Sequence, residues 1–498
     1  MQRMIFFFAS IIVVAIFSTK VTSRFGVPVL LAFLGIGLLV GGDGLNLYNF
    51  KNAASTKTIA DILLIFILFV GGFDTKRSSL KLVAGPALAL STIGVLLTTF
   101  LLGLLIHAIA RYPLAYSFMV AAIIASTDAA AVMMVTKLRP VREKVSATLE
   151  IESAANDPIA IILTLAFVKI VAGQSSSPLQ LIFELAWDLA GGVFVAFVCA
   201  KASRFLFDRL ESENRGYYYV LIIGVILMTY GLADIVKANG IIAVFFMGYW
   251  LGNSEFVCKR GVSNFLEGIS AFANLALFLM LGLLALPHNF AGIWKEGLLI
   301  SVLLIFIVRP ATVLVCTLPF KYTMRERLFI MWGGIKGAVP IVLASYPAAY
   351  GLDPSGSIFD IIFFAVLLSC LVQGSTMGPL ASLLKLTVAP KPHSPYSVEL
   401  HSLRKSDADM FELRIEPGAV SEGKRIRDLG LPNDTLISSI VRNEKIVPAK
   451  GSTFLMADDL IYVLAPKGSI DEISCSLNEP RTPLSEREAR EMDIESRR

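Results

Sequence analysis

The sequence predicts an all-α polytopic membrane protein with 13 transmembrane helices, followed by a small α/β domain at the C-terminus. Of the 498 residues, 55% are hydrophobic and only 17% are charged. The mean hydropathy is +0.70, well above the usual value for soluble globular proteins. Apolar segments of the length that a bilayer requires, roughly 20 residues, recur up to residue 386 and then stop.

The apolar segments are separated by short polar stretches. They lie near 4–23, 27–42, 58–74, 81–108, 114–136, 148–171, 180–206, 217–236, 239–256, 265–287, 291–318, 327–350 and 356–386. The first could be a secretory signal, but its single Arg3 and weak cleavage site favour a retained span.

Basic residues alternate between the loops. Between the segment limits given above, the loops that follow odd-numbered segments hold thirteen Lys and Arg, against four in the loops that follow even-numbered segments. Because cytoplasmic loops carry the excess of Lys and Arg, we expect the N-terminus outside and the C-terminus in the cytoplasm.

A short glycine pattern occurs twice. Gly37 and Gly41 lie in "GIGLLVG", and Gly248 and Gly252 lie in "MGYWLGN", 211 residues and seven segments later. Seven is odd, so the two copies have opposite orientations, as the inverted repeats of secondary transporters do. The alternative is that these small residues only allow helices to pack closely.

The composition changes after the last apolar segment. Residues 1–387 form the predicted membrane domain, and 388–410 are polar and contain prolines, as linkers do. Residues 411–472 show short alternating strands, with a hairpin turn at Asn443–Glu444. This domain is small for a stand-alone core, so we expect it to pair with a second copy. Residues 473–498 read as a charged, disordered tail.

The segment "IESAANDPIAIIL", 151–163, places Asp157 inside a predicted span. A carboxylate there must face a water-filled cavity, bind a cation or take up a proton. It cannot hold the proton and the cation together, and this mutual exclusion is sufficient for exchange. Ser153 lies one turn earlier on the same helix face and offers a neutral oxygen. Pro158 leaves the carbonyl of Ala154 without its helical partner.

Two other segments have the composition of interrupted helices. In "ASTDAAAV", 125–132, Thr127 and Asp128 interrupt an Ala-rich run. In "GGIKGAVP", 333–340, three glycines, Lys336 and a proline stand in mid-span. Two broken helices in corresponding repeats indicate a transport site. Lys336 itself could be either a functional or a packing charge.

Arg309, in "IFIVRPA", stands deep in an apolar run and keeps its charge. It therefore needs an anion. Glu152 is the best candidate once Asp157 and Asp128 are assigned to the ion, and it lies about 140° around the helix from Asp157, so it faces another direction. Simpler roles stay open for the other polar residues: Ser153 and Thr127 could bond helix carbonyls, Asn156 could bond between helices, and Asp74 could be an ordinary interface residue.

The motifs "ESAANDP", "STDAAAV" and "WGGIKGAVP" resemble those of the cation–proton antiporter superfamily, in its NhaP-type first family, over roughly 1–386. The resemblance implies a homodimer with two crossing broken helices, and a core domain that moves against a dimerisation domain. It also implies that Asp157 binds the cation and the proton. Ser153 and Thr127 would be further cation ligands, Asp128 an accessory group at the crossing, and Asn156 a stabiliser of the site.

The resemblance also implies that Glu152 and Arg309 form a structural ion pair. Lys336 stands where many members have Arg. Ala129 is a departure, since many members have Pro after the Asp.

Residues 411–472 resemble the C-terminal domain of potassium-conductance regulators, the TrkA-C domain, through G-x-x-I-x-D-L-x-L-P, the I-x-R hairpin and the D-D-L strand. The resemblance implies dimerisation and control by a ligand, which is a cyclic dinucleotide in some relatives. Together, the two domains resemble bacterial inner-membrane potassium/proton antiporters of the cell-volume-regulation type.

The sequence therefore predicts electroneutral exchange of one proton for one K⁺ or Na⁺, with K⁺ favoured. We expect no enzyme activity, no catalytic residues and no cofactor, and no phosphate-binding loop motif occurs in the sequence. The main alternative is a ligand-gated monovalent cation channel. An intramembrane aspartyl protease using Asp128 and Asp157 is disfavoured, because no predicted span contains G-x-G-D.

Overall fold

The computed structural model describes residues 2–25, 29–42, 53–128, 132–133, 139–174, 178–353, 356–388, 408–432, 434–443, 445–466 and 468–479. The chain divides into two compact units, Met1–Pro390 and Lys391–Arg498.

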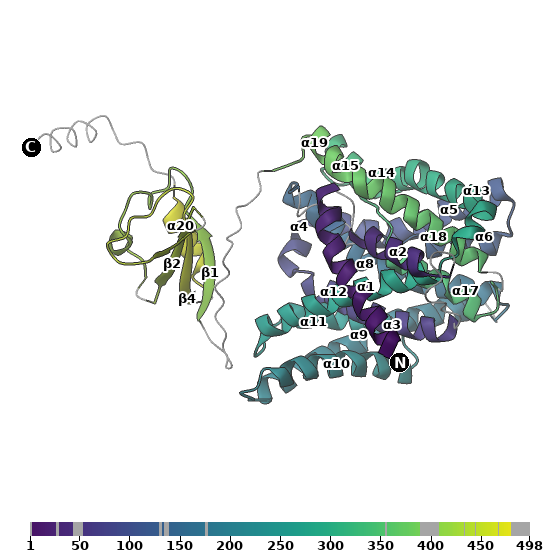
Figure 1. Cartoon of the computed structure of the whole chain (residues 1–498), viewed down its shortest axis with the longest axis horizontal. Helices are drawn as coiled ribbons and strands as arrows, with labels where there is room; N and C mark the ends of the chain where they lie inside the picture. Colours follow the sequence, from purple (N-terminus) through teal and green to yellow (C-terminus); the bar gives the residue numbers. More distant parts are fainter. Residues whose placement is uncertain are drawn as a thin grey trace, which may run out of the picture. The chain divides into compact units, whose positions relative to one another are not determined.

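The first unit is a helical bundle (Figure 1). Its helices are α1 Gln2–Phe25, α2 Val29–Val40, α3 Ala53–Asp74, α4 Arg77–Ala89, α5 Val95–Ala110, α6 Leu114–Ile123, α8 Glu143–Val171, α9 Pro178–Arg209, α10 Gly216–Ile235, α11 Gly240–Gly252, α12 Lys259–Leu284, α13 Pro287–Val302, α14 Arg309–Thr317, α15 Met324–Trp332, α16 Ala338–Ala344, α17 Tyr346–Ala349, α18 Ser357–Ser369 and α19 Ser375–Leu383. Each predicted apolar segment overlaps at least one of these helices, although part of segment 114–136 lies outside the described residues. Within the described ranges, seven helical stretches are long and apolar enough to cross a membrane, and others are apolar but shorter.

Three of the long helical stretches contain a π-helical turn. These turns are Leu90–Gly94 between α4 and α5, Leu303–Val308 between α13 and α14, and Cys370–Gly374 between α18 and α19. A π turn widens the helix by one residue and commonly marks a functional site.

Both predicted helix interruptions are present in the described residues. Helix α6 ends at Ile123, and the chain is not helical by residues 126–128. Helix α15 ends at Trp332, residues 334–337 are not helical, and α16 begins at Ala338. Glycine and short polar side chains stand at both places, and these residues favour a helix end over its continuation.

The repeated glycines lie at two close helix contacts. Helix α2 packs on α12, where Gly37 meets Gly282, and α3 packs on α11, where Gly72 meets the backbone of Phe245. On α11, Gly248 likewise lies against the backbone of α3. A side chain at these positions would push the helices apart, so the small residues determine the interhelical distance.

The second unit is a four-stranded antiparallel sheet in the order β1-β4-β2-β3, with helix α20 against it (Figure 1). The elements are β1 Ala408–Arg414, β2 Leu436–Arg442, β3 Lys445–Pro448, β4 Leu460–Pro466 and α20 Ile470–Asn478. Strands β2 and β3 form the predicted hairpin, although Glu444 in its turn lies outside the described residues.

The strands and the helix of this unit extend beyond the predicted limits, 411–472. Strand β1 begins at Ala408, inside the predicted linker 388–410, because backbone pairing with β4 does not depend on side-chain polarity. Helix α20 extends into the predicted tail 473–498, where Ile473 and Leu477 are buried in the core. These two residues are four apart and lie on one helix face, a pattern that the surrounding charges obscure.

We predict that Gly72→Ala lowers the thermal stability of the protein and that Gly71→Ala does not. A Cβ at Gly72 would overlap the carbonyl oxygen of Phe245, whereas a Cβ at Gly71 meets nothing within 4 Å. Overpacking of this kind costs about 1–3 kcal/mol. Unfolding midpoints in detergent provide the measurement, and equal midpoints for the two variants would contradict the packing described here.

Candidate ion-binding site

The two interrupted helices cross at their non-helical segments. The backbone N–H of Asp128 donates to the carbonyl of Ile335 at 2.8 Å. Nζ of Lys336 donates to the carbonyls of Ala125 at 3.0 Å and Ser126 at 2.9 Å. These bonds join the two breaks directly, so the predicted interruptions form one structural element.

The crossing is also balanced electrostatically. The carbonyl end of α6 carries partial negative charge, and the Lys336 ammonium lies against the carbonyls that follow it. At the other break, Gly337 is the N-cap of α16, and a Cβ there would overlap the Asp128 carboxyl group. The Asp128 carboxylate thus lies at the positive end of α16, and Gly337 allows this approach.

Helix α8 contributes the side chains next to the crossing. Oγ1 of Thr127 and Oγ of Ser153 lie 2.8 Å apart, and Nδ2 of Asn156 donates to Oγ1 of Thr127 at 2.7 Å. Asp157 is 8% exposed. Its buried Oδ1 has no hydrogen-bond partner among the described residues. A buried carboxylate oxygen left unbonded is costly in a protein, which points to a ligand or proton at this position.

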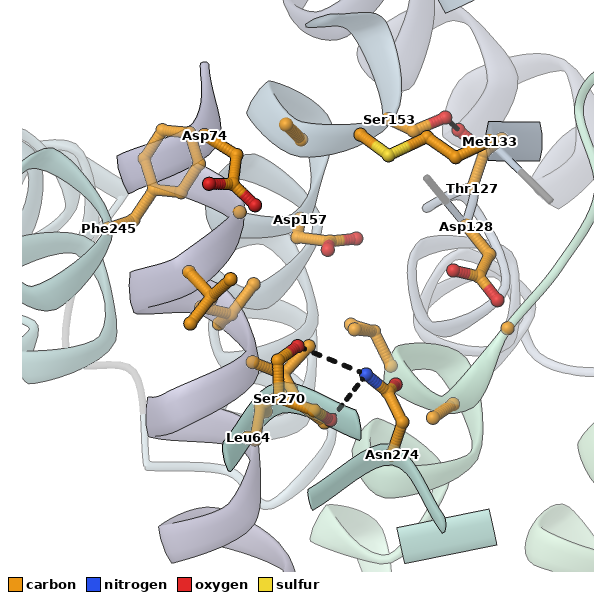
Figure 2. A pocket seen from close by; sticks show the side chains of 18 of the residues that line it. Leu64, Asp74, Thr127, Asp128, Met133, Ser153, Asp157, Phe245, Ser270 and Asn274 are labelled. Carbon is orange, nitrogen blue, oxygen red and sulfur yellow. Dashed lines mark hydrogen bonds between the residues drawn. The ribbon is translucent and has the colours of Figure 1, made fainter. Parts of the chain in front are cut away.

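A cavity of about 130 Å³ brings these groups together. Figure 2 shows the carboxylates of Asp157 and Asp128 facing the same space, with Ser153 and Thr127 beside it. This volume is sufficient for a monovalent cation with a few water molecules, since a water molecule occupies about 30 Å³ in the liquid. Carboxylate, hydroxyl and carbonyl oxygens are the ligand types that such hard cations bind.

Three polar residues of the cavity wall were not expected from the sequence as site residues. Ser270 and Asn274 come from α12, where Nδ2 of Asn274 donates to the carbonyl of Ser270 at 2.9 Å (Figure 2). Asp74, predicted to be an ordinary interface residue, lines the cavity from α3 and also lines a second hollow with Lys76 and Arg77. The sequence shows these polar residues inside two predicted spans, 58–74 and 265–287. Their spacing alone does not indicate that they face this cavity.

The predicted ion pair between Glu152 and Arg309 is present. Nη1 of Arg309 bonds Oε1 of Glu152, and Nη2 bonds Oε2 at 3.0 Å and the carbonyl of Ile330 at 3.1 Å. Both side chains are buried. Gly334 lies against the Arg309 guanidinium, with Nε 2.6 Å from the position of a Cβ. The pair therefore joins α8, α14 and the second helix break.

Comparisons with known proteins identify a family for each part of the chain. The sodium/hydrogen exchanger transmembrane model matches residues 9–383, and the TrkA-C domain model matches residues 410–475. The K⁺/H⁺ antiporter NhaP2 of Shewanella sp. (strain MR-4) is 34% identical over 93% of this chain and 81% of its own length. The Na⁺/H⁺ antiporter 1 of Methanocaldococcus jannaschii is 27% identical over 77% of this chain and 95% of its own length.

A solved structure of the sodium proton antiporter MjNhaP1 from the same archaeon at pH 8 superimposes with a TM-score of 0.68 and 25% identity. The match covers 77% of this chain and 99% of that one. The fold and the site together define a membrane-embedded cation/proton antiporter. The chain belongs to the sodium/hydrogen exchanger family, and it carries a TrkA-C domain after the membrane unit.

We predict that Arg309→Met strongly destabilises the protein and that Glu152→Gln/Arg309→Met recovers most of the loss. The single change leaves Glu152 buried and unpaired, which costs about 3–5 kcal/mol, whereas the double change removes both charges. The unfolding midpoint in detergent is the measurement.

The matched control for this pair is Lys169→Gln, which breaks the exposed Lys169–Glu184 ion pair. Such a surface pair contributes about 0–1 kcal/mol, so the midpoint should barely move. If the double variant is no more stable than Arg309→Met, the unpaired charge of Glu152 is not the cause of the destabilisation, and the prediction is wrong.

Proposed function

We propose that this protein exchanges one proton for one monovalent cation, with the two competing for Asp157. The observation that carries the proposal is the buried, unbonded Oδ1 of Asp157 at a cavity that also presents Ser153, Thr127 and Asp128. In the cation-loaded state, Asp157, the Ser153 hydroxyl and the Thr127 carbonyl hold the ion. In the proton-loaded state, Asp157 is neutral and the cation has left.

The remaining residues support this site. Asn156 orients Thr127 through the bond between Nδ2 and Oγ1. Asp128 is the accessory carboxylate at the crossing, and Lys336 holds the first break through two carbonyls. Glu152 and Arg309 cancel each other's charge beside the site and keep α8 in position.

Charge balance favours electroneutral exchange. Arg309 compensates Glu152, and the cavity presents the carboxylates of Asp157, Asp128 and Asp74. In this proposal only Asp157 exchanges its occupant, and a proton or a monovalent cation adds one positive charge to it. The site therefore carries the same charge in both loaded states, and the membrane potential does no net work over one exchange cycle.

K⁺ is the favoured cation in this proposal. The relatives from Shewanella sp. and Alkalimonas amylolytica, 34% and 30% identical over 93% of this chain, are named as K⁺/H⁺ antiporters. Na⁺ is the second candidate, since the archaeal relative is named as a Na⁺/H⁺ antiporter. For the TrkA-C domain we propose a nucleotide ligand, such as a cyclic dinucleotide.

The membrane arrangement that we propose has thirteen spans arranged as inverted repeats. Its support is a pair of matched contacts: α2 packs on α12 as α11 packs on α3, both through glycines. If α2 corresponds to α11 and α3 to α12, a two-fold axis in the membrane exchanges the two contacts.

The same proposal places the protein as a homodimer in the bacterial inner membrane, with the N-terminus outside and the C-terminus in the cytoplasm. The loop basic residues support this orientation. In each protomer the core, with the two crossed breaks, moves against the dimer scaffold to carry the site across.

We predict that Asp157→Asn abolishes exchange without preventing folding, because the amide can neither release a proton nor neutralise a cation. The measurement is the internal pH of proteoliposomes after addition of K⁺ or Na⁺. Asp234→Asn, at an exposed position near the end of α10, is the matched control and should exchange normally. Undiminished exchange by Asp157→Asn would remove this carboxylate from the mechanism.

We also predict that lowering the pH raises the apparent KM for the cation while the maximal rate at saturating cation changes little. A proton on Asp157 excludes the cation, so protons act as competitive inhibitors and stronger acidity requires more cation. Initial rates over a matrix of pH and K⁺ concentration test this, and a pH-independent KM would contradict competition.

The alternative function, a gated cation channel, makes a different prediction in the same vesicles. A channel would carry a cation current under a cation gradient without obligatory proton movement. Exchange that persists when the membrane potential is clamped at zero, without net current, favours the antiporter.

A further inference from the structure

The second helix break removes a specific backbone hydrogen bond. In an uninterrupted helix, the N–H of Lys336 would donate to the carbonyl of Trp332, four residues earlier. Helix α15 ends at Trp332, so this bond is not made. Both groups then need other partners, because an unpaired backbone group away from water is costly.

Two side chains of the helical stretch Ser357–Leu383, which comprises α18, the π turn and α19, take the place of that bond. The N–H of Lys336 donates to Oγ of Ser369 at 3.1 Å, and Oγ of Ser369 donates to Oε1 of Gln373 at 2.6 Å. Nε2 of Gln373 donates to the carbonyl of Trp332 at 2.9 Å. The chain of bonds thus runs from one side of the break to the other.

The location of the two residues fits this arrangement. Ser369 ends α18, and Gln373 lies four residues later inside the π-helical turn Cys370–Gly374. They are 2% and 1% exposed. Sγ of Cys370 also lies 2.9 Å from the carbonyl oxygen of Lys336 and donates to it. The backbone of Lys336 is therefore held at both its N–H and its C=O by the same helical stretch.

Lys336 is the residue that transmits this restraint to the ion site. Its ammonium bonds the carbonyls of Ala125 and Ser126, directly before Thr127 and Asp128. Next to it in sequence, Ile335 accepts the bond from the N–H of Asp128. Any shift of the Lys336 backbone moves the segment that carries these two site residues.

We propose that Ser369 and Gln373 are positioning residues of the ion site: they bridge the gap in α15–α16 and thereby set the position of Lys336 against the 125–128 segment. The inference rests on the proposed function, since it assigns them a role in cation affinity. A purely structural role would instead affect only the amount of folded protein and its stability.

The test compares Ser369→Ala and Gln373→Glu with the wild-type protein in proteoliposomes. Ser369→Ala removes the acceptor of the Lys336 N–H, and Gln373→Glu keeps the shape but removes the donor to the Trp332 carbonyl. We expect the KM for K⁺ and for Na⁺ to rise about tenfold, the lower end of losses found when groups that orient metal ligands are removed. The maximal rate per folded protein should stay within about twofold.

Two further variants serve as controls. Ser369→Thr keeps the hydroxyl group and should retain a near wild-type KM. Thr376→Val removes a bond from the same helical stretch to the same tryptophan, since Nε1 of Trp332 donates to Oγ1 of Thr376 at 2.8 Å, but leaves the break intact. Its KM should not change. If Ser369→Ala does not fold, Ser369→Cys is the milder replacement, because a thiol accepts hydrogen bonds only weakly.

Hydrogen–deuterium exchange supplies a readout that does not depend on transport. A peptide covering residues 333–338 should exchange faster in Ser369→Ala and Gln373→Glu than in Thr376→Val. A wild-type KM in folded Ser369→Ala and Gln373→Glu, or unchanged amide protection of that peptide, would overturn the inference. A wild-type protein that shows no exchange would instead refute the proposed function, and the protection data would still report on the bridge.

Discussion

The organisation of this protein depends on the need to satisfy backbone polar groups where two helices are interrupted inside an apolar bundle. Without water, each free N–H or C=O there would cost several kcal/mol. The two breaks meet this need mutually, through the bond from Asp128 to Ile335 and through Lys336 on the carbonyls of Ala125 and Ser126. The crossing leaves polar oxygens in the interior without exposing the backbone to lipid, which makes an ion site possible there.

The second constraint concerns the ionisable side chains at the ion site, some of which have a fixed partner and some of which face the cavity. Arg309 occupies both oxygens of Glu152, and Lys336 is committed to backbone carbonyls. Neither cation forms a direct ion pair with Asp157, whose Oδ1 lies at the cavity without a hydrogen-bond partner among the described residues. A permanent ion pair at Asp157 would block both cation and proton. Among the described residues Asp157 therefore has no direct cationic partner, whereas Glu152 is paired with Arg309.

Sequence reasoning could predict the parts of this site that have a local signature. The length of the apolar segments predicted the helices, and glycine with short polar residues predicted the two breaks. The isolated charges of Glu152 and Arg309 predicted an ion pair between them. It could not place Asp74 or Asn274 at the cavity, because a single polar residue in an apolar span does not indicate which neighbour it faces. Ser369 and Gln373 were missed for the same reason, since their partners lie 33 and 41 residues away. Sequence reasoning also did not identify Ile473 and Leu477 as core residues of the C-terminal unit, because they stand among charged residues.

The central claim is that a proton and a cation occupy Asp157 by turns, and proton release on cation binding tests it most directly. The purified protein in detergent can be titrated with K⁺ or Na⁺ by calorimetry in buffers of different ionisation enthalpy. Deprotonation of a ligand couples metal binding to proton release, so we expect up to about one proton released per cation near the pH at which Asp157 is protonated, and none from Asp157→Asn. Cation binding by the wild-type protein without proton release at any pH would contradict the account.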